Sequence, residues 1–334
     1  MYGHYLLSGH TIHSQSIKAD TASAYLLAAA TLLSHFDIVP GRDGRKRFRT
    51  DKYLCNEIAV VLKEAKRYES VKDRREAFTL AMQQKLRTEC KDQDPDSLAS
   101  ALTDWFNGGL LSGYRKTEWC QENKYYRIGT SNKNRAGDPA AFTLNDVTFL
   151  DEYGNKIAQK KAIANRSTVK RVIIRWRLQK NGRVNETKGY SRNTLSIALD
   201  AVEAWLNIVA RFFRLMPHGN ERGPVMDVPI SIFRLDNKKI QNITDKLVEK
   251  TMRELAFSVY GITSKAALSK FTCHSLRVGA CCILQAAGAK PEFIKEQLRW
   301  NSDSWQVYTR DLCILSHQHN AILFELSQMP VQRW

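Results

Sequence analysis

Two short stretches near the end of the sequence hold side chains whose types and spacing suit chemistry on an anion. In the first, 273–280, His274 and Arg277 are three positions apart. Residues at this spacing project from one face of a helix, so both could address a single anion, and the helix N-terminus would add its dipole. The second stretch, 298–310, contains Trp300 and Tyr308. His274 and Arg277 together predict an anion-binding site at the start of a helix.

Each of these residues also has an ordinary structural interpretation when it is taken alone. A single histidine such as His274 is more often structural than catalytic, and Tyr308 could be an ordinary tyrosine of a helix. Trp300 and Trp305 could both be core aromatics. Only the joint pattern favours a catalytic role.

The order of the four residues resembles that of the tyrosine recombinase superfamily, which includes phage integrases and the Cre recombinase. Proteins of that superfamily carry a His-x-x-Arg box that opens a buried helix, then a histidine or tryptophan, and then a nucleophilic tyrosine on a short helix. His274, Arg277, Trp300 and Tyr308 match this order. The spacing between Trp300 and Tyr308 is slightly shorter than in Cre and resembles recombinases of some eukaryotic mobile elements. The resemblance therefore implies a transposon-borne or virus-borne enzyme.

The resemblance implies two further catalytic positions upstream. An Arg-x-x-Glu/Asp pair is expected early in the catalytic domain, and Arg115 and Glu118 supply it, although without the usual Thr-Gly-Leu-Arg context. Taken alone, this pair could be a solvated pair on a helix. A lysine is expected at the tip of a β-hairpin, and Lys180 stands directly before an Asn-Gly turn. Lys170 and Lys188 compete for that role.

The implied reaction cuts and rejoins DNA through a 3′-phosphotyrosine intermediate. Arg115 and Arg277 would hold the non-bridging phosphate oxygens and neutralise the charge of the transition state. Trp300 would donate one further hydrogen bond, and Tyr308 would attack in line.

Proton transfer falls to the remaining residues of the implied site. His274 would act as base or proton relay, and Lys180 as general acid for the departing 5′-oxygen. Glu118 would orient Arg115 or His274. The covalent link conserves bond energy, so no metal, cofactor or ATP is expected.

The charge of the chain favours nucleic acid as the partner over a merely solvated face or anionic lipid, and the resemblance implies double-stranded DNA. The formal net charge is +17 and the isoelectric point is about 9.6, which suits a polyanion. Residues 156–192 hold twelve lysines and arginines against one acid, Glu186. The expected DNA contacts lie in a basic loop at 41–49, on the polar face of a strand at 169–178, and beyond its turn. They are Arg45, Lys46, Arg47, Arg49, Arg171, Arg175, Arg177 and Arg183.

Apolar periodicity predicts a mainly helical, two-domain protein with one small antiparallel sheet or hairpin in the catalytic domain. The polar segment 89–96 precedes Ser97, a good N-cap, so the boundary is expected there. The resemblance implies that residues 1–96 form a helical core-binding domain, by position only, and that 97–334 form the catalytic domain. Helices are expected at 22–33, 57–68, 76–86, 97–106, 195–215, 244–259, 274–287, 291–298 and 312–326, and strands at 142–150 and 169–178. On the second strand, Val172, Ile174, Trp176 and Leu178 would share the apolar face.

Several classes of protein are disfavoured. No apolar run approaches the ~20 residues of a membrane span, and residues 1–15 lack the apolar stretch of a signal peptide. The seven scattered cysteines form no C-x-x-C pair, so neither disulfides nor a zinc site are expected. An intracellular protein is predicted, nuclear in a eukaryotic host and otherwise in the cytoplasm or nucleoid.

Three alternatives stay open at this stage. The chain could be a catalytically silent, recombinase-derived DNA-binding protein, or a type IB topoisomerase that relaxes supercoils without a specific site. A metal-dependent transposase or nuclease would need clustered carboxylates, and the acids form no such pattern. For a recombinase, strand exchange needs four nucleophiles, so a homotetramer on two DNA sites is expected.

Overall fold

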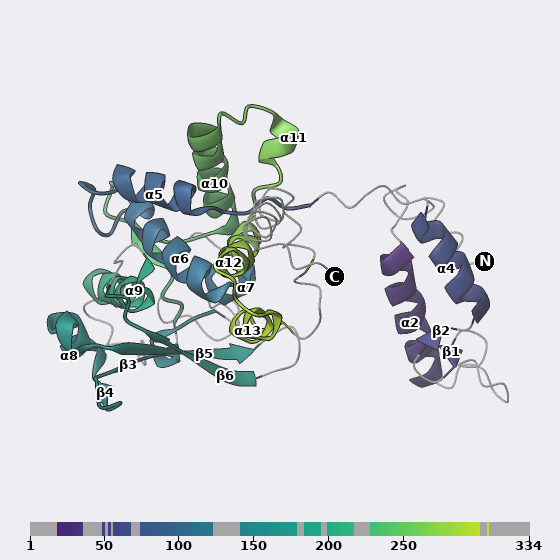
Figure 1. The fold of residues 1–334 in the computed structure, drawn as a ribbon, viewed down its shortest axis with the longest axis horizontal. Helices are drawn as coiled ribbons and strands as arrows, with labels where there is room; N and C mark the ends of the chain where they lie inside the picture. The colour runs from purple at the N-terminus through teal and green to yellow at the C-terminus, as the bar shows by residue number, and fades with distance from the viewer. Residues whose placement is uncertain are drawn as a thin grey trace, which may run out of the picture. The chain divides into compact units, whose positions relative to one another are not determined.

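The computed structural model describes residues 19–35, 49–50, 53–54, 56–67, 74–122, 141–178, 184–194, 199–216, 228–300 and 306. The chain forms two units, Met1–Asp73 and Arg74–Trp334 (Figure 1). The first unit contains helices α2 (Ala19–His35) and α4 (Asn56–Arg67) and an antiparallel pair of short strands, β1 (Arg49–Thr50) and β2 (Tyr53–Leu54). The two helices pack through Ala19, Ala22, Leu26 and Leu62.

The second unit begins earlier than the boundary predicted at residues 96 and 97. The polar segment 89–96 is tied to helix α9 (Ala201–Leu215) of this unit. The buried Asp96 carboxylate accepts hydrogen bonds from Arg214 Nε at 3.0 Å and Nη2 at 2.7 Å. The Pro95 carbonyl accepts one from Arg211 Nε at 3.0 Å. The polar segment that predicted the boundary therefore contains Asp96, which is a buried partner for Arg214 of α9.

A four-stranded antiparallel sheet of order β4-β3-β5-β6 lies in the second unit (Figure 1). Its strands are β3 (Val147–Leu150), β4 (Lys156–Ile157), β5 (Arg171–Leu178) and β6 (Val184–Ser191). A separate antiparallel pair is formed by β7 (Ile232–Arg234) and β8 (Ile240–Asn242).

The alternation predicted along β5 is confirmed at three of its four apolar positions. Val172, Ile174 and Trp176 are buried, but Leu178 is 48% exposed. Leu178 pairs with Val184 at the end of the β5–β6 ladder, where that partner is exposed as well. The side chain alternates as predicted, but at this end of the ladder it is not covered by the core.

The strand predicted at 142–150 starts only at Val147. Residues Leu144–Asp146 form a 3₁₀ turn, because the Asp146 carboxylate accepts hydrogen bonds from the Thr143 N–H at 2.9 Å and its hydroxyl at 3.0 Å. This reciprocal cap satisfies backbone groups that a strand would have paired across the sheet.

Helices make up most of the rest of the second unit, so the predicted fold class, mainly α with a small antiparallel sheet, is confirmed. The predicted helix at 312–326 lies outside the described residues. None of the helices within the described ranges is long and apolar enough to cross a membrane. The helices not yet named are α5 (Leu80–Glu89), α6 (Leu98–Ser112), α7 (Lys116–Trp119), α8 (Gln159–Ala164), α10 (Asp245–Tyr260), α11 (Lys265–Leu268), α12 (Ser275–Ala286) and α13 (Pro291–Gln297).

Helix α6 continues through Gly108 and Gly109, beyond the end that the sequence predicted at residue 106. These glycines serve packing. A β-carbon on Gly108 would lie 2.3 Å from Tyr114 Oη, and one on Gly109 would lie 3.0 Å from Leu276 Cδ1. The missing side chains thus let Tyr114 and helix α12 approach α6 closely, which brings the segments around 115 and 277 together.

Gly279 of α12 provides a test of this close packing. A β-carbon there would lie 2.0 Å from the Phe78 carbonyl oxygen, and the Phe78 N–H donates to the Ser275 carbonyl at 2.9 Å, so the backbone is held in place. We expect Gly279→Ala to lower the free energy of unfolding by about 2 kcal/mol or more, measured by urea denaturation. Gly189→Ala is the control, because the nearest heavy atom is 4.0 Å from its new β-carbon. Equal losses in the two variants would contradict this account.

Candidate active site

Arg277 lies in the first turn of α12 and points into the interior of the second unit. Its side chain is only 2% exposed. Nη1 donates to the Gly113 carbonyl at 2.7 Å, and Nη2 donates to the Leu298 carbonyl. The guanidinium carbon lies 4.3 Å from the centroid of the Trp300 ring, a cation–π distance. The structure therefore brings together two of the predicted catalytic residues.

Arg115 reaches the same place from a distant part of the sequence. It is the N-cap of α7, and its own N–H donates to Glu118 Oε2 at 2.9 Å while Nη1 lies 3.2 Å from Glu118 Oε1. Nη2 donates to the Arg299 carbonyl at 3.4 Å. Arg115 and Arg277 thus bind consecutive carbonyls, those of Arg299 and Leu298. The predicted pair of arginines converges on the turn 298–300.

His274 stands at the N-cap of α12, among these cationic groups. Burial, and after it the charges of Arg277, Arg75 and Arg115 in that order, together lower the pKa of His274 to about 4. A histidine with this pKa is neutral near pH 7 and can accept a proton. His274 therefore lies within electrostatic reach of both predicted arginines.

Arg299 is a residue of this site that sequence reasoning missed. It is buried, and its Nη2 lies 3.1 Å and 2.9 Å from the two carboxylate oxygens of Glu118. Its guanidinium carbon lies 3.9 Å from the centroid of the Trp176 ring, and Trp176 Nε1 donates to Glu118 Oε2 at 3.1 Å. A lone arginine between two apolar residues gives no pattern that would reveal these partners. Arg75, whose charge also lowers the pKa of His274, was missed as well, because it stands within the charged run 72–76 and nothing there sets it apart.

Two residues of the predicted site, its lysine and its nucleophilic tyrosine, lie in segments that the structure does not describe. They are Lys180 and Tyr308. Of the two competing lysines, Lys170 donates to the Ser167 carbonyl at 3.0 Å on the surface. Lys188 of β6 is less exposed and lies 3.0 Å from Glu296 Oε1 of α13.

The predicted DNA-binding arginines of β5 differ from one another. Arg175 and Arg177 pair with the buried carboxylate of Asp146, with Arg175 Nη2 3.0 Å from Oδ1 and Arg177 Nε 3.0 Å from Oδ2. Arg177 also donates to the Ala141 carbonyl. Arg171 is exposed. Part of the positive charge of this face is therefore balanced by Asp146. Arg45, Lys46, Arg47, Arg183 and the side chain of Arg49 lie outside what the structure describes.

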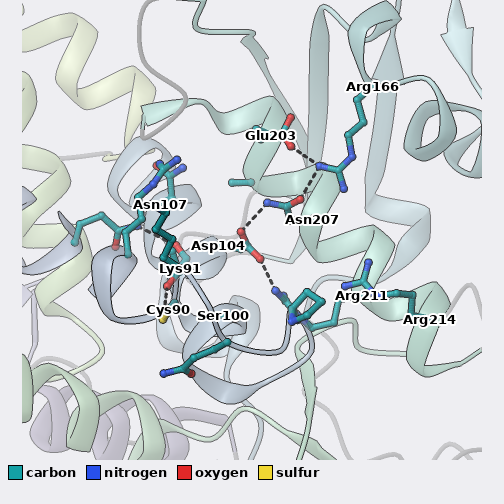
Figure 2. Close-up of a pocket in the computed structure, with 16 residues that line it drawn as sticks. Cys90, Lys91, Ser100, Asp104, Asn107, Arg166, Glu203, Asn207, Arg211 and Arg214 are labelled. Atoms are coloured by element: carbon teal, nitrogen blue, oxygen red, sulfur yellow. Dashed lines mark hydrogen bonds and ion pairs between the residues drawn. The ribbon is translucent and has the colours of Figure 1, made fainter. Parts of the chain in front are cut away.

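A second polar region of the unit is a cavity of about 450 Å³ between α5, α6 and α9. Figure 2 shows Asp104 at its centre, between Asn207 and Arg211. Asn207 Nδ2 donates to Asp104 Oδ1 at 3.0 Å, Arg211 pairs with the other oxygen, and Arg166 binds both Asn207 and Glu203. Burial raises the pKa of Asp104. These polar groups bind one another across the helices, which indicates a structural role.

No group of three or more potential metal ligands is found among the residues that the structure describes.

No protein-family model matches the chain, and no curated protein matches it. A crystal structure of XerA recombinase is similar at 13% identity, with 99% of this chain and 97% of that chain covered and a TM-score of 0.39. The Tn1549 transposon integrase in complex with a circular intermediate DNA is similar at 12% identity, with 93% and 89% covered and a TM-score of 0.37.

Proposed function

We propose that this chain is a tyrosine recombinase, which cuts and rejoins DNA through a 3′-phosphotyrosine intermediate. One observation carries the proposal. Arg115 and Arg277, from segments far apart in the sequence, meet at the turn that carries Trp300, and His274 opens the helix that carries Arg277. The alternative interpretation of Arg115 and Glu118, a solvated pair on a helix, does not fit these contacts. The Glu118 carboxylate is buried and also binds Arg299.

The charges of the site suit attack on a phosphodiester. Two guanidiniums can hold the non-bridging oxygens and stabilise the charge that develops on them, and the Trp300 indole N–H can donate a further hydrogen bond. Tyr308 attacks the phosphorus and becomes bonded to it, and the 5′-oxygen leaves with a proton. The free phenol has a pKa near ~10, so it must lose its proton to a base.

His274 is the base in this proposal. Its low pKa keeps the imidazole neutral at neutral pH, so its lone pair is available to take the phenol proton directly or through water. Lys180 supplies the proton for the 5′-oxygen, and Glu118 orients Arg115 through the contacts described above.

The net charge of +17 supplies the affinity for duplex DNA. Within the described residues, the exposed Arg171 is a direct candidate for a phosphate contact. We assign the basic residues 45–49 and Arg183 to the same role. A tetramer on two sites would provide the four tyrosines that strand exchange requires. A mobile element in a eukaryotic host, with a nuclear enzyme, is our proposed origin.

The test is capture of covalent protein–DNA adducts from a pool of random duplexes. Each duplex carries a nick, so cleavage releases a short fragment with a free 5′-hydroxyl. The fragment diffuses away, and its loss prevents rejoining, so the phosphotyrosine is trapped. The full chain is incubated with the pool in EDTA, adducts are isolated after denaturation in detergent, and the attached DNA is sequenced. We expect adducts that survive EDTA and share one sequence motif, with the protein joined to a 3′-phosphate.

Other outcomes of this experiment correspond to other functions. Adducts without a shared motif, together with relaxation of supercoiled plasmid, would indicate a topoisomerase. Specific DNA binding without any adduct would indicate a catalytically silent DNA-binding protein. Adducts that disappear in EDTA would contradict the proposed mechanism.

A further inference from the structure

The turn Leu298–Trp300 lies between the two arginines of the proposed site. Arg277 donates to the carbonyl at its first residue and lies over the indole ring of its last. Arg115 Nη2 donates to the carbonyl of the middle residue, Arg299, at 3.4 Å. The positions of both guanidiniums therefore depend on the backbone of this one turn.

Arg299 has an uncommon backbone conformation in this turn. Its φ is 57°, in the left-handed region that residues with a β-carbon rarely adopt. Such a conformation persists when the surroundings hold the residue firmly. The side chain supplies that hold. Beyond its contacts with Glu118 and Trp176, Nη1 donates to the Ser112 carbonyl at 3.3 Å, so the guanidinium is fixed from three directions.

The carboxylate of Glu118 is shared between two arginines. Arg299 contacts both of its oxygens from the buried side, while Arg115 contacts it from a side chain that is 22% exposed. If Arg299 were absent, Arg115 would be the only guanidinium at this buried carboxylate among the residues that the structure describes. The attraction would draw Arg115 inward and balance its charge. With Arg299 present, the three groups carry one net positive charge on the outer guanidinium, where an anion can approach.

We propose that Arg299 is a positioning residue of the active site. It binds both carboxylate oxygens of Glu118 from the buried side and fixes the backbone of the turn 298–300. Arg115 and Arg277 are thereby held where they can bind the scissile phosphate. Arg299 does not itself touch the DNA. The inference rests on the proposed function, because its consequence is the rate of DNA cleavage.

The first test compares Arg299→Lys with the unaltered chain on a nicked duplex that carries the motif found by adduct capture. Lysine keeps the charge but lacks the planar fork that spans both oxygens of Glu118. We expect the single-turnover cleavage rate at saturating DNA to fall about 100-fold, while the Kd for DNA changes by less than about threefold. The matched control is Arg211→Lys, which alters another buried arginine that is paired with a carboxylate, Asp104, outside the site. Its cleavage rate per folded molecule should stay unchanged.

A double-mutant cycle separates positioning from general stabilisation. Because Arg299 positions Arg115 as well as Arg277 in this proposal, Arg299→Lys should slow cleavage less in an Arg115→Ala background than in the natural one. If the two losses multiply, Arg299 acts independently and the proposal is wrong. An Arg299→Lys variant that cleaves at the natural rate would also overturn it. Absence of any adduct from the unaltered chain would instead overturn the proposed function.

A second variant covers the case in which Arg299→Lys does not fold. Arg299→Met combined with Glu118→Gln removes both buried charges together, which proteins tolerate better than the loss of one partner. We expect this pair to fold, as judged by circular dichroism and thermal melting. It should bind DNA and cleave it at least about tenfold slower than the unaltered chain, since Arg115 loses its anchor. Cleavage at the natural rate by this folded pair would refute the positioning role.

Discussion

Replacing Tyr308 with phenylalanine should abolish covalent adducts while leaving DNA binding intact. The phenol oxygen is the atom that bonds to phosphorus, and no other group of the proposed site can replace it. We expect adduct yield on the captured motif to fall at least about 1,000-fold. The Kd for the same duplex should change by less than about threefold, because the lost hydroxyl is not a phosphate-binding group. Adducts are measured by denaturing gel electrophoresis, and binding by fluorescence anisotropy.

Tyr153→Phe is the matched control for this experiment. Tyr153 is 81% exposed in the turn between β3 and β4, so removal of its hydroxyl should alter neither adducts nor folding. Persistent adducts in the Tyr308→Phe variant would show that another residue is the nucleophile. Mapping the DNA-linked peptide by mass spectrometry would then identify it.

Much of the site could be predicted because its recognisable parts are local in sequence. His274 and Arg277 lie three positions apart, and so do Arg115 and Glu118. These spacings place each pair at one helix terminus without knowledge of the rest of the fold. The meeting of the two pairs was a hypothesis taken from a family resemblance. The structure supplies the contacts, through carbonyls of the turn 298–300.

Arg299 shows why the rest could not be predicted. Its partner Glu118 lies 181 positions away, and nothing in the neighbouring residues indicates that the arginine is buried. Burial of a charge becomes favourable only when a partner and hydrogen bonds are supplied by tertiary structure. Sequence periodicity cannot register such a partner.

Two of the differences between the predicted and the observed fold have a common physical cause. The helix predicted at 97–106 ends before the glycines of α6, and the polar segment 89–96 was interpreted as a domain boundary. In the structure, Gly108 makes room for Tyr114, and Asp96 binds Arg214 of α9. In both cases a long-range contact decides the role of a residue whose local preference points elsewhere. The strand β5 was predicted well because its alternation is itself a local signal of a half-buried sheet.

Arg277→Ala should lower the cleavage rate by about 100-fold to 1,000-fold, since it removes one of the two guanidiniums that stabilise the transition-state charge. It should also change the pH dependence. Arg277 is the first charge, after burial itself, among the causes that lower the pKa of His274. Without that charge the pKa of His274 should rise from about 4 toward the ordinary value for histidine. The variant should therefore lose activity on the acidic side at a higher pH than the natural chain does.

The single-turnover rate measured between pH 4 and pH 8 separates these two effects. In the natural chain the acidic limb assignable to His274 should have its midpoint near the acid end of this range, at about pH 4. In Arg277→Ala the midpoint should move to higher pH, but not to the ordinary value for histidine because burial remains, and the plateau should be lower. Arg277→Lys restores a positive charge and should return the midpoint toward its natural position without restoring the full rate, because lysine cannot bridge two phosphate oxygens as a planar fork. Arg211→Ala, a loss of an equally buried arginine outside the site, should change neither feature. A plateau loss in Arg277→Ala without any shift on the acidic side would mean that His274 is not the base, even if Arg277 binds the phosphate.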